Sequence, residues 1–128
     1  MSATDAQLAK IEEHFGCSLP DDYRAFLIAR GSLNEFLGQD FLQLFSADEV
    51  LPMNNAGQIQ QRFPCAMVIG GDGSREMLAF DFRDGRNGLV LFDISAADWS
   101  SAIPQAPSFA AFMDEFPNRG WNFGEDAR

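Results

Sequence analysis

The stretch CAMVIGGDGSREMLAFDFRDGRNGLVLFDI, residues 65–94, is the clearest indication of the fold, because it predicts three consecutive strands joined by short turns. Its first part is a short apolar run that ends in glycines. The next part alternates, with Leu78, Phe80 and Phe82 directed to one face. The segment RDGRNG, residues 83–88, contains two turn signals before the apolar run that returns. We therefore predict an antiparallel meander with one nearly continuous apolar face, which other elements must cover.

The stretch LPDDYRAFL, residues 19–27, predicts a short helix upstream of the meander. Pro20 suits the first turn, where its missing N–H costs no hydrogen bond, and the two aspartates that follow lie against the positive end of the helix dipole. Ser18 is a candidate cap through the spacing Ser-x-x-Asp, and Gly31 marks the end of the helix. The apolar face, which we expect to anchor this helix to the core, consists of Tyr23, Phe26 and Leu27.

An earlier helix is predicted at the N-terminus. It begins at the capping box Thr4-x-x-Gln7 and ends at Gly16. The two short helices, joined by the segment GCSL, are expected to form a helical hairpin. The apolar residues that recur along the first helix are Leu8, Ile11 and Phe15.

The region between these helices and the meander is less regular. Residues 33–45, LNEFLGQDFLQLF, are rich in large apolar side chains broken by Gly38, which favours short strands, with a helical turn as the alternative. The capping box Ser46-x-x-Glu49 opens another short helix. We expect the polar segment of residues 54–64 to be a loop with some helical character.

A last helix follows the meander. It opens at Ser108 and is predicted to stop at Pro117, so that residues 117–128 form a loosely held tail. The apolar stripe suits a core face that covers the sheet, and a cofactor wall is the alternative. The residues of the stripe are Phe109, Phe112, Met113 and Phe116.

The order of helices, meander and helix predicts a single α+β domain over residues 1–128. We expect an antiparallel-rich twisted sheet, with the N-terminal helical hairpin and the C-terminal helix packed against it. No apolar run approaches the length of a membrane helix, and the first residues lack the features of a signal peptide. The sequence therefore predicts a cytoplasmic protein that does not bind membranes, either a monomer or a weak homodimer.

The net charge restricts the kinds of partner. Nineteen acidic residues against nine basic ones give −10 at pH 7. Such a surface repels phosphate backbones, which argues against direct nucleic-acid binding. It suits docking on a basic protein, because opposite fields speed encounter and select partners. The alternative is that the acidity only keeps the protein soluble.

The sequence predicts no catalytic residue and no bound metal. His14 is the single histidine, and at the end of a helix it suits the negative pole of the dipole. Cys17 and Cys65 have no CxxC partner and are expected to be buried free thiols, with a disulfide between them as the alternative. Asp81 and Asp84 could act as acid and base, but nothing around them indicates a pocket.

Two glycine-rich segments resemble ligand loops only superficially. Residues 70–74, GGDGS, lack the Lys-Ser/Thr ending of a phosphate loop, so a hairpin turn is the better interpretation. Residues 81–88, DFRDGRNG, have an arginine where a calcium loop needs an oxygen ligand, and no glutamate closes the loop. We therefore expect no cofactor.

The order of these segments resembles the SUKH superfamily, and within it the SMI/KNR-type group named after a fungal cell-wall-synthesis regulator. The resemblance covers roughly residues 6–116. Its strongest pieces are Leu19-Pro20-x-x-Tyr23 with Phe26-Leu27, the turn from Ile69 to Gly73, and Ser108-Phe109-x-x-Phe112. One departure is Arg30-Gly31 after the second helix, where members of the group often have Asn-Gly.

The resemblance implies an α+β fold without catalytic residues. It also implies a non-catalytic immunity protein that binds and neutralises a cognate secreted bacterial toxin, in many cases a nuclease with a basic groove. The alternative is a general interaction scaffold that links regulatory partners without antagonising a toxin.

Turn and loop positions are the natural places for partner contacts, since a rigid sheet can present them while the core stays intact. In the C-terminal tail, a tryptophan adds a candidate aromatic anchor. The predicted partner-binding residues are Glu35, Asp40, Asp72, Glu76, Asp84 and Trp121.

Overall fold

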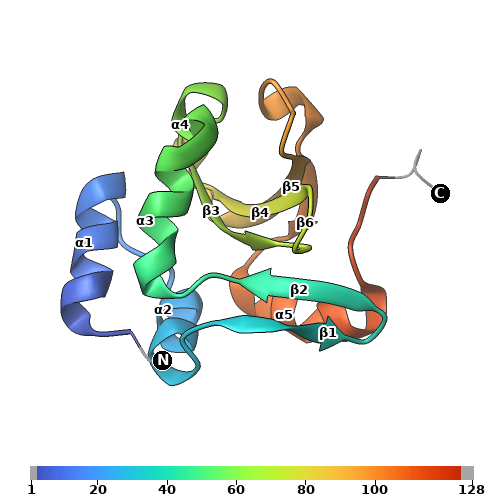
Figure 1. Cartoon of the computed structure of the whole chain (residues 1–128), viewed down its shortest axis with the longest axis horizontal. Coiled ribbons are helices and arrows are strands. Elements are labelled where there is room, and N and C mark those ends of the chain that lie inside the picture. Colours follow the sequence, from blue (N-terminus) through green and yellow to red (C-terminus); the bar gives the residue numbers. More distant parts are fainter. Residues whose placement is uncertain (1–2, 125–128) are drawn as a thin grey trace.

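The computed structural model describes residues 3–124 and confirms an α+β fold, with helices packed against a six-stranded antiparallel sheet (Figure 1). The strands lie side by side in the order of the sequence. They are β1 Leu33–Leu37, β2 Asp40–Leu44, β3 Ala66–Gly71, β4 Glu76–Asp81, β5 Gly88–Asp93 and β6 Ile103–Ala106. The helices are α1 Asp5–Phe15, α2 Asp21–Ala29, α3 Ala47–Asn55, α4 Ile59–Arg62 and α5 Phe109–Arg119, with short 3-10 turns η1 Ala56–Gln58, η2 Arg83–Gly85 and η3 Trp99–Ser101.

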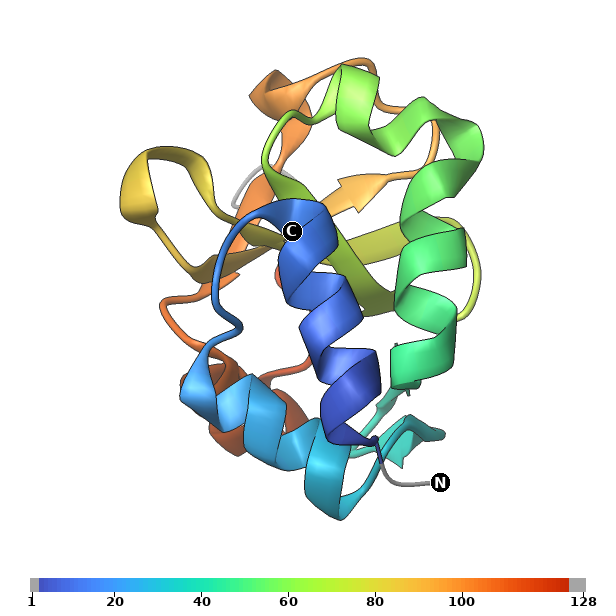
Figure 2. The same ribbon diagram turned by 90° about the vertical axis from the view of Figure 1, so that its left-hand side faces the viewer.

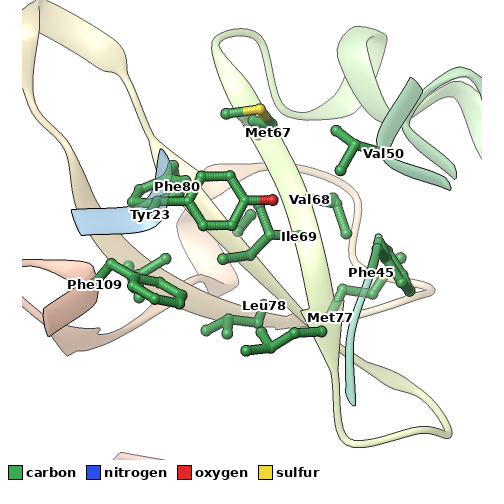
Figure 3. Packing of buried hydrophobic residues seen from close by; sticks show 14 of the residues in the cluster. Tyr23, Phe45, Val50, Met67, Val68, Ile69, Met77, Leu78, Phe80 and Phe109 are labelled. Carbon is green, nitrogen blue, oxygen red and sulfur yellow. The ribbon is translucent and has the colours of Figure 1, made fainter. Parts of the chain in front are cut away.

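The predicted meander is confirmed as β3, β4 and β5, but both of its faces are buried, where the sequence indicated one apolar face. On one side the rings of Tyr23 and Phe109 pack against Phe80, with centroids 5.2 Å and 6.5 Å away (Figure 3). On the other side of β3 lie Val50 and Phe45 (Figure 3). Helices therefore cover both faces of the central strands, which explains why their sequence is almost continuously apolar.

The sequence predicts that nine residues share one core, three from LPDDYRAFL, three from the alternating strand of the meander and the three phenylalanines of the last helix, and seven of them are buried. The two others, Phe26 and Phe82, are partly buried and pack against that core. The seven buried residues are Tyr23, Leu27, Leu78, Phe80, Phe109, Phe112 and Phe116.

The junction between β2 and β3 is short. Only two pairs of residues join the strands, and one of them is Leu44 with Gly70. A Cβ atom at Gly70 would lie 1.9 Å from the carbonyl oxygen of Gln43, so only glycine permits this approach of the two backbones. Farther along the β3 edge, the side chain of Asn54 in α3 takes the place of a strand beside Val68: it donates to the Val68 carbonyl at 2.8 Å and accepts from the Val68 N–H at 2.7 Å.

The helix predicted from LPDDYRAFL is α2, with two differences at its start. Pro20 is the N-cap residue, with φ −56° and ψ 140°, and so lies outside the helix, and the Ser18 cap is absent. Instead Asp22 accepts from the N–H of Tyr23 at 2.8 Å and from the N–H of Ala110, in the first turn of α5, also at 2.8 Å. The second aspartate therefore ties α2 to the C-terminal helix.

Helix α1 has both of its predicted caps, the Thr4 capping box and the left-handed Gly16. Its position is set by α3, beside which it lies (Figure 2). The connection to α2 is held by Glu12, whose carboxylate accepts from the N–H of Leu19 at 2.7 Å and from the Arg24 guanidinium. These bonds lower the pKa of Glu12, with the Leu19 bond as the largest cause.

The strands expected in residues 33–45 are present, and so is the Ser46 capping box at the start of α3. Strand β6 was not predicted from the sequence. Pro104 lies within it, and a proline normally argues against a strand. β6 is the terminal strand of the sheet, where the missing N–H can face away from the ladder, so proline is tolerated there.

The prediction that residues 117–128 form a loosely held tail is wrong for the part that the structure describes, residues 117–124. α5 continues through Pro117 to Arg119, and Trp121 is only 6% exposed. The Trp121 N–H donates to Asp40 at 2.9 Å, and its indole donates to the carbonyl of Phe41 at 3.1 Å. The segment is thus fixed against β2, while residues 125–128 lie outside the described part.

Candidate protein-binding surface

Two of the predicted binding residues, Asp72 and Glu76, lie together at the turn between β3 and β4, where Asp93 joins them. Asp72 accepts from the N–H groups of Ser74 at 2.8 Å and of Glu76 at 3.1 Å, so its first role is to shape the turn. The pKa of Glu76 is raised by burial, and the neighbouring Asp93 and Asp72 carboxylates raise it further. This end of the sheet is therefore acidic, with Arg75 paired to Asp93 at 3.0 Å.

Three of the predicted residues lie elsewhere than expected. Glu35, placed on a loop by the sequence, is in β1, where it is exposed and 3.8 Å from Arg30. Asp40 is in β2 and holds the backbone of Trp121. Trp121 itself packs on Phe116 with ring centroids 4.7 Å apart, so its prediction as a surface anchor is wrong.

Asp84 is the last of the predicted residues. It is exposed in η2, in a left-handed conformation at φ 54°, and lies 3.8 Å from Arg86. It belongs to a separate turn, far along β4 and β5 from Asp72. Of the predicted residues, Glu35 and Asp84 have exposed side chains. Asp72 is half-buried, but a partner can reach it at the β3–β4 turn.

Asp81 and Asp84, considered as an acid and a base, form ion pairs instead. Asp81 is 6% exposed, and Arg83 donates to it at 2.9 Å and 3.0 Å. Burial alone would raise the pKa of Asp81, but these bonds and the Arg86 guanidinium 3.5 Å away leave it below its usual value. A carboxylate held ionised in this way has no proton to donate near neutral pH, so it does not serve as a general acid.

The two cysteines are free, but they are not both buried as predicted. Cys65 is exposed in the turn before β3, with φ 71°. Cys17 is partly buried. Both line a hollow of about 360 Å³, together with His14 and Phe82. Burial raises the pKa of the Cys17 thiol, with smaller effects from Glu12 and Cys65. Within residues 3–124, no three His, Cys, Asp or Glu side chains are grouped so that they could hold a metal ion.

The sequence interpretation missed an aromatic surface on the β1–β2 hairpin. Phe36 in β1 is 67% exposed and lies edge-on against Phe41 of β2, with ring centroids 5.2 Å apart. In LNEFL the leucines and Glu35 share one face, and Phe36 shares the other with the polar Asn34. This alternation was the available signal that a large ring faces away from the core.

Next to this aromatic surface lies a polar hollow of about 460 Å³ between the start of α3, the start of α1 and the beginning of β1. Asp48 and Glu49 of the first turn of α3 both line it, and Asn34 of β1 forms part of its wall. The other lining residues are Ala3, Gln7, Ser32, Ser46 and Ala47.

The model of the SMI1 / KNR4 family (SUKH-1) matches residues 2–115. The chain belongs to the SUKH-1 family. Proteins of this family bind partner proteins and are non-enzymatic immunity or regulatory proteins. One relative is the uncharacterized protein YnaB of Bacillus subtilis (strain 168), which is 25% identical over 114 residues that cover 88% of this chain and 74% of the relative.

The SUKH-1 assignment agrees with how the ionisable groups are used. The buried acid is committed to arginine pairs, and the turn acids to backbone N–H groups. None of the helices in the described range is long and apolar enough to cross a lipid bilayer. The accessible groups include exposed acids and the Phe36 ring, which are features of a surface for protein contacts.

Proposed function

We propose that this SUKH-1 domain is an immunity protein that binds and neutralises a cognate secreted bacterial toxin. It acts without catalysis, as a monomer in the cytoplasm, by occupying a basic surface of the toxin. A nuclease toxin fits best, since its substrate groove carries positive charge for the phosphate backbone. The observation that carries the proposal is a net charge of −10 on a family member whose buried acid is held by arginines.

Physical arguments support a role for charge in this binding. An acidic surface steers a basic partner at long range and raises the association rate, and this effect decreases as salt screens it. The exposed acids Glu35 and Asp84 and the half-buried turn acid Asp72 are separated along the molecule, so a groove-sized partner can meet more than one of them.

The test is co-expression with the C-terminal toxin domain encoded in the adjacent reading frame. We expect the protein to restore growth and to form a stable complex with that domain in size-exclusion chromatography. A complex that forms without restoring growth would favour a general interaction scaffold. Absence of any complex would contradict both functions.

The role of charge is tested by replacing acids with amides, which keep the hydrogen bonds of the turns. Glu35→Gln, Asp72→Asn and Asp84→Asn together should slow association at low salt, with the loss shrinking as salt rises. The matched control changes three exposed acids elsewhere, Glu13→Gln, Asp21→Asn and Asp114→Asn. Equal slowing by both triple variants would show that only the total charge matters.

A further inference from the structure

Strand β1 ends the sheet and presents an unpaired edge. Among the described strands it pairs with β2 alone. The hairpin closes over two residues, so Leu37 and Asp40 form the hydrogen-bonded pair beside the turn, and Phe36 and Phe41 form a non-hydrogen-bonded pair. The backbone N–H and C=O groups of Phe36, and by the same alternation those of Asn34, therefore point away from β2.

This edge lacks most of the devices that protect terminal strands. β1 contains no proline, its register with β2 has no bulge, and no helix covers the residues from Asn34 to Phe36, which are all exposed. Exposed edges of this kind are templates for the addition of another strand. The opposite edge, β6, carries Pro104 and is followed by the fixed segment around Asn122, which bonds to Gln105 and to the Pro104 carbonyl.

The side chains around the β1 edge define what an added strand would carry. On the face of Asn34 and Phe36, an apolar residue would contact the Phe36 ring, and a residue two positions away would reach the hollow beside Asn34. The hollow contains Asp48 and Glu49. Their two negative charges outweigh the half positive charge at the start of α3, so the hollow favours a cation. Glu35, on the other face, favours a basic residue at the position between.

The charge also decides between a foreign partner and a second copy of this chain. Two copies would each bring −10 and would place Glu35 and the acidic hollow near their own equivalents across a two-fold axis. A basic partner avoids this repulsion and is attracted by the same negative charges.

We propose that β1 binds an extended segment of a basic protein partner, which joins the sheet antiparallel to β1. The segment places an apolar residue on Phe36 and an Arg or Lys in the hollow formed with Asp48 and Glu49. The proposal rests on the proposed function, and it names the surface and the chemistry of the segment that the toxin would present.

The test uses a blocked heptapeptide, Ser-Thr-Ile-Lys-Arg-Thr-Ser, titrated into the isotope-labelled full chain and followed by amide NMR shifts. In the antiparallel register, Ile faces Phe36, Arg faces the hollow and Lys faces Glu35. We expect saturable shifts centred on the Asn34 and Phe36 amides, with a dissociation constant in the millimolar range. The acidic peptide Ser-Thr-Ile-Glu-Glu-Thr-Ser should give none.

Variants separate the contributions of the backbone and the charges. Phe36→Pro removes an N–H that points away from β2, so it should abolish the shifts without loss of an internal ladder bond. Asp48→Asn with Glu49→Gln keeps the hydrogen bonds of the α3 cap and should weaken binding about threefold to tenfold. Glu13→Gln with Asp114→Asn removes the same charge elsewhere and should change the affinity less than twofold. If Phe36→Pro does not fold, Phe36→Ala and the charge variants carry the test.

Shifts that are absent, or that do not saturate at Asn34 and Phe36, would overturn the proposal. So would unchanged binding by the Asp48/Glu49 variant, or sedimentation that shows a dimer joined through β1. If the peptide fails while the toxin is still neutralised, this surface is wrong and the immunity function stands. If the peptide binds and no toxin complex forms, the function is wrong and the strand-binding edge stands.

Discussion

The β3–β4 hairpin and the β1–β2 hairpin belong to one sheet, but their surroundings are opposite. Every residue from Met77 to Asp81 in β4 is buried, and helices cover both of its faces. In β1–β2 only the face of Leu33, Leu42 and Leu44 is covered, and Phe36 on the other face is 67% exposed. Among the described residues, the strands of the two hairpins pair through two positions, Gln43 with Gly71 and Leu44 with Gly70. Stability is therefore concentrated in one hairpin, while the other can meet a partner without disturbing the core.

Their acidic residues differ in the same way. Asp81 in β4 is enclosed by Arg83 and Arg86, whereas Glu35 in β1 is exposed and 3.8 Å from a half-exposed arginine. Exposed ion pairs at that distance contribute little to stability and separate readily. The acids of the edge hairpin are therefore available for contacts that the central acids cannot make.

The largest expected contrast is between two phenylalanines. Phe80→Ala should cost about 3–5 kcal/mol of unfolding free energy, because it opens a cavity among fully buried rings. Phe36→Ala should change it by less than about 0.5 kcal/mol, since that ring is mostly in solvent. Urea unfolding followed by circular dichroism measures both. A large loss in Phe36→Ala would mean that the edge hairpin is part of the core.

The second-largest loss of stability is expected at Asn54 of α3, whose side chain bonds to the β3 backbone where no strand lies beside it. Asn54→Ala should cost about 2–4 kcal/mol, because it leaves the N–H and C=O of buried Val68 without partners. Asn118→Ala, on the exposed end of α5, is the control and should be nearly neutral. Thermal unfolding by calorimetry compares them, and equal melting temperatures would show that the Asn54 bonds are replaced by water.

A smaller change of opposite sign is expected at Tyr23. Its hydroxyl is fully buried, and within the described residues it has no hydrogen-bond partner, which also explains why burial raises its pKa. Tyr23→Phe keeps the ring contacts with Phe80 and Phe109 and removes the unsatisfied group, so it should stabilise the protein by about 1 kcal/mol. Chemical denaturation measures the change. A clear loss of stability would reveal a bound water on the hydroxyl.

The smallest expected effect is a pH dependence at the α1–α2 connection. The folded-state pKa of Glu12 is lowered, first by the Leu19 N–H and then by Arg24, so the ionised form contributes stability above about pH 4.5. That contribution is lost as the pH falls toward the lowered value. Glu12→Gln should cost less than about 1 kcal/mol at pH 7, because the pair is partly exposed, and its stability should fall less between pH 5 and pH 3. Parallel pH slopes for the two proteins would contradict this assignment.

Local signals in the sequence predicted most of the elements but not all of their boundaries. Capping boxes at Thr4 and Ser46, the glycine at position 16 and the alternation of β4 act within a few residues, so they are readable from sequence. The extension of α5 past Pro117 and the proline-containing β6 were missed. Both involve long-range contacts, with Gly38 and Asp40 of the β1–β2 hairpin in one case and with β5 in the other.

The candidate site was predicted less well than the fold. Acidity and family resemblance indicated a protein-binding surface, but Glu35, which was predicted on a turn or loop, lies in β1. Trp121 was misplaced because nothing in the tail sequence shows that Asp40 and Phe41, about eighty residues earlier, accept its N–H groups. Phe36 was missed because a large ring in a strand normally indicates the core.

Most of the elements, the acidic character and the family can be read from the sequence alone, since these follow from periodicity, caps, composition and motifs near one another in the chain. Which residues remain accessible depends on how the folded chain packs. Burial depends on what packs above each face: α5 and Trp121 cover one side of the β1–β2 hairpin, and no element covers Phe36 on the other. For the same reason only the folded chain brings Asp48 and Glu49 beside the free edge of β1.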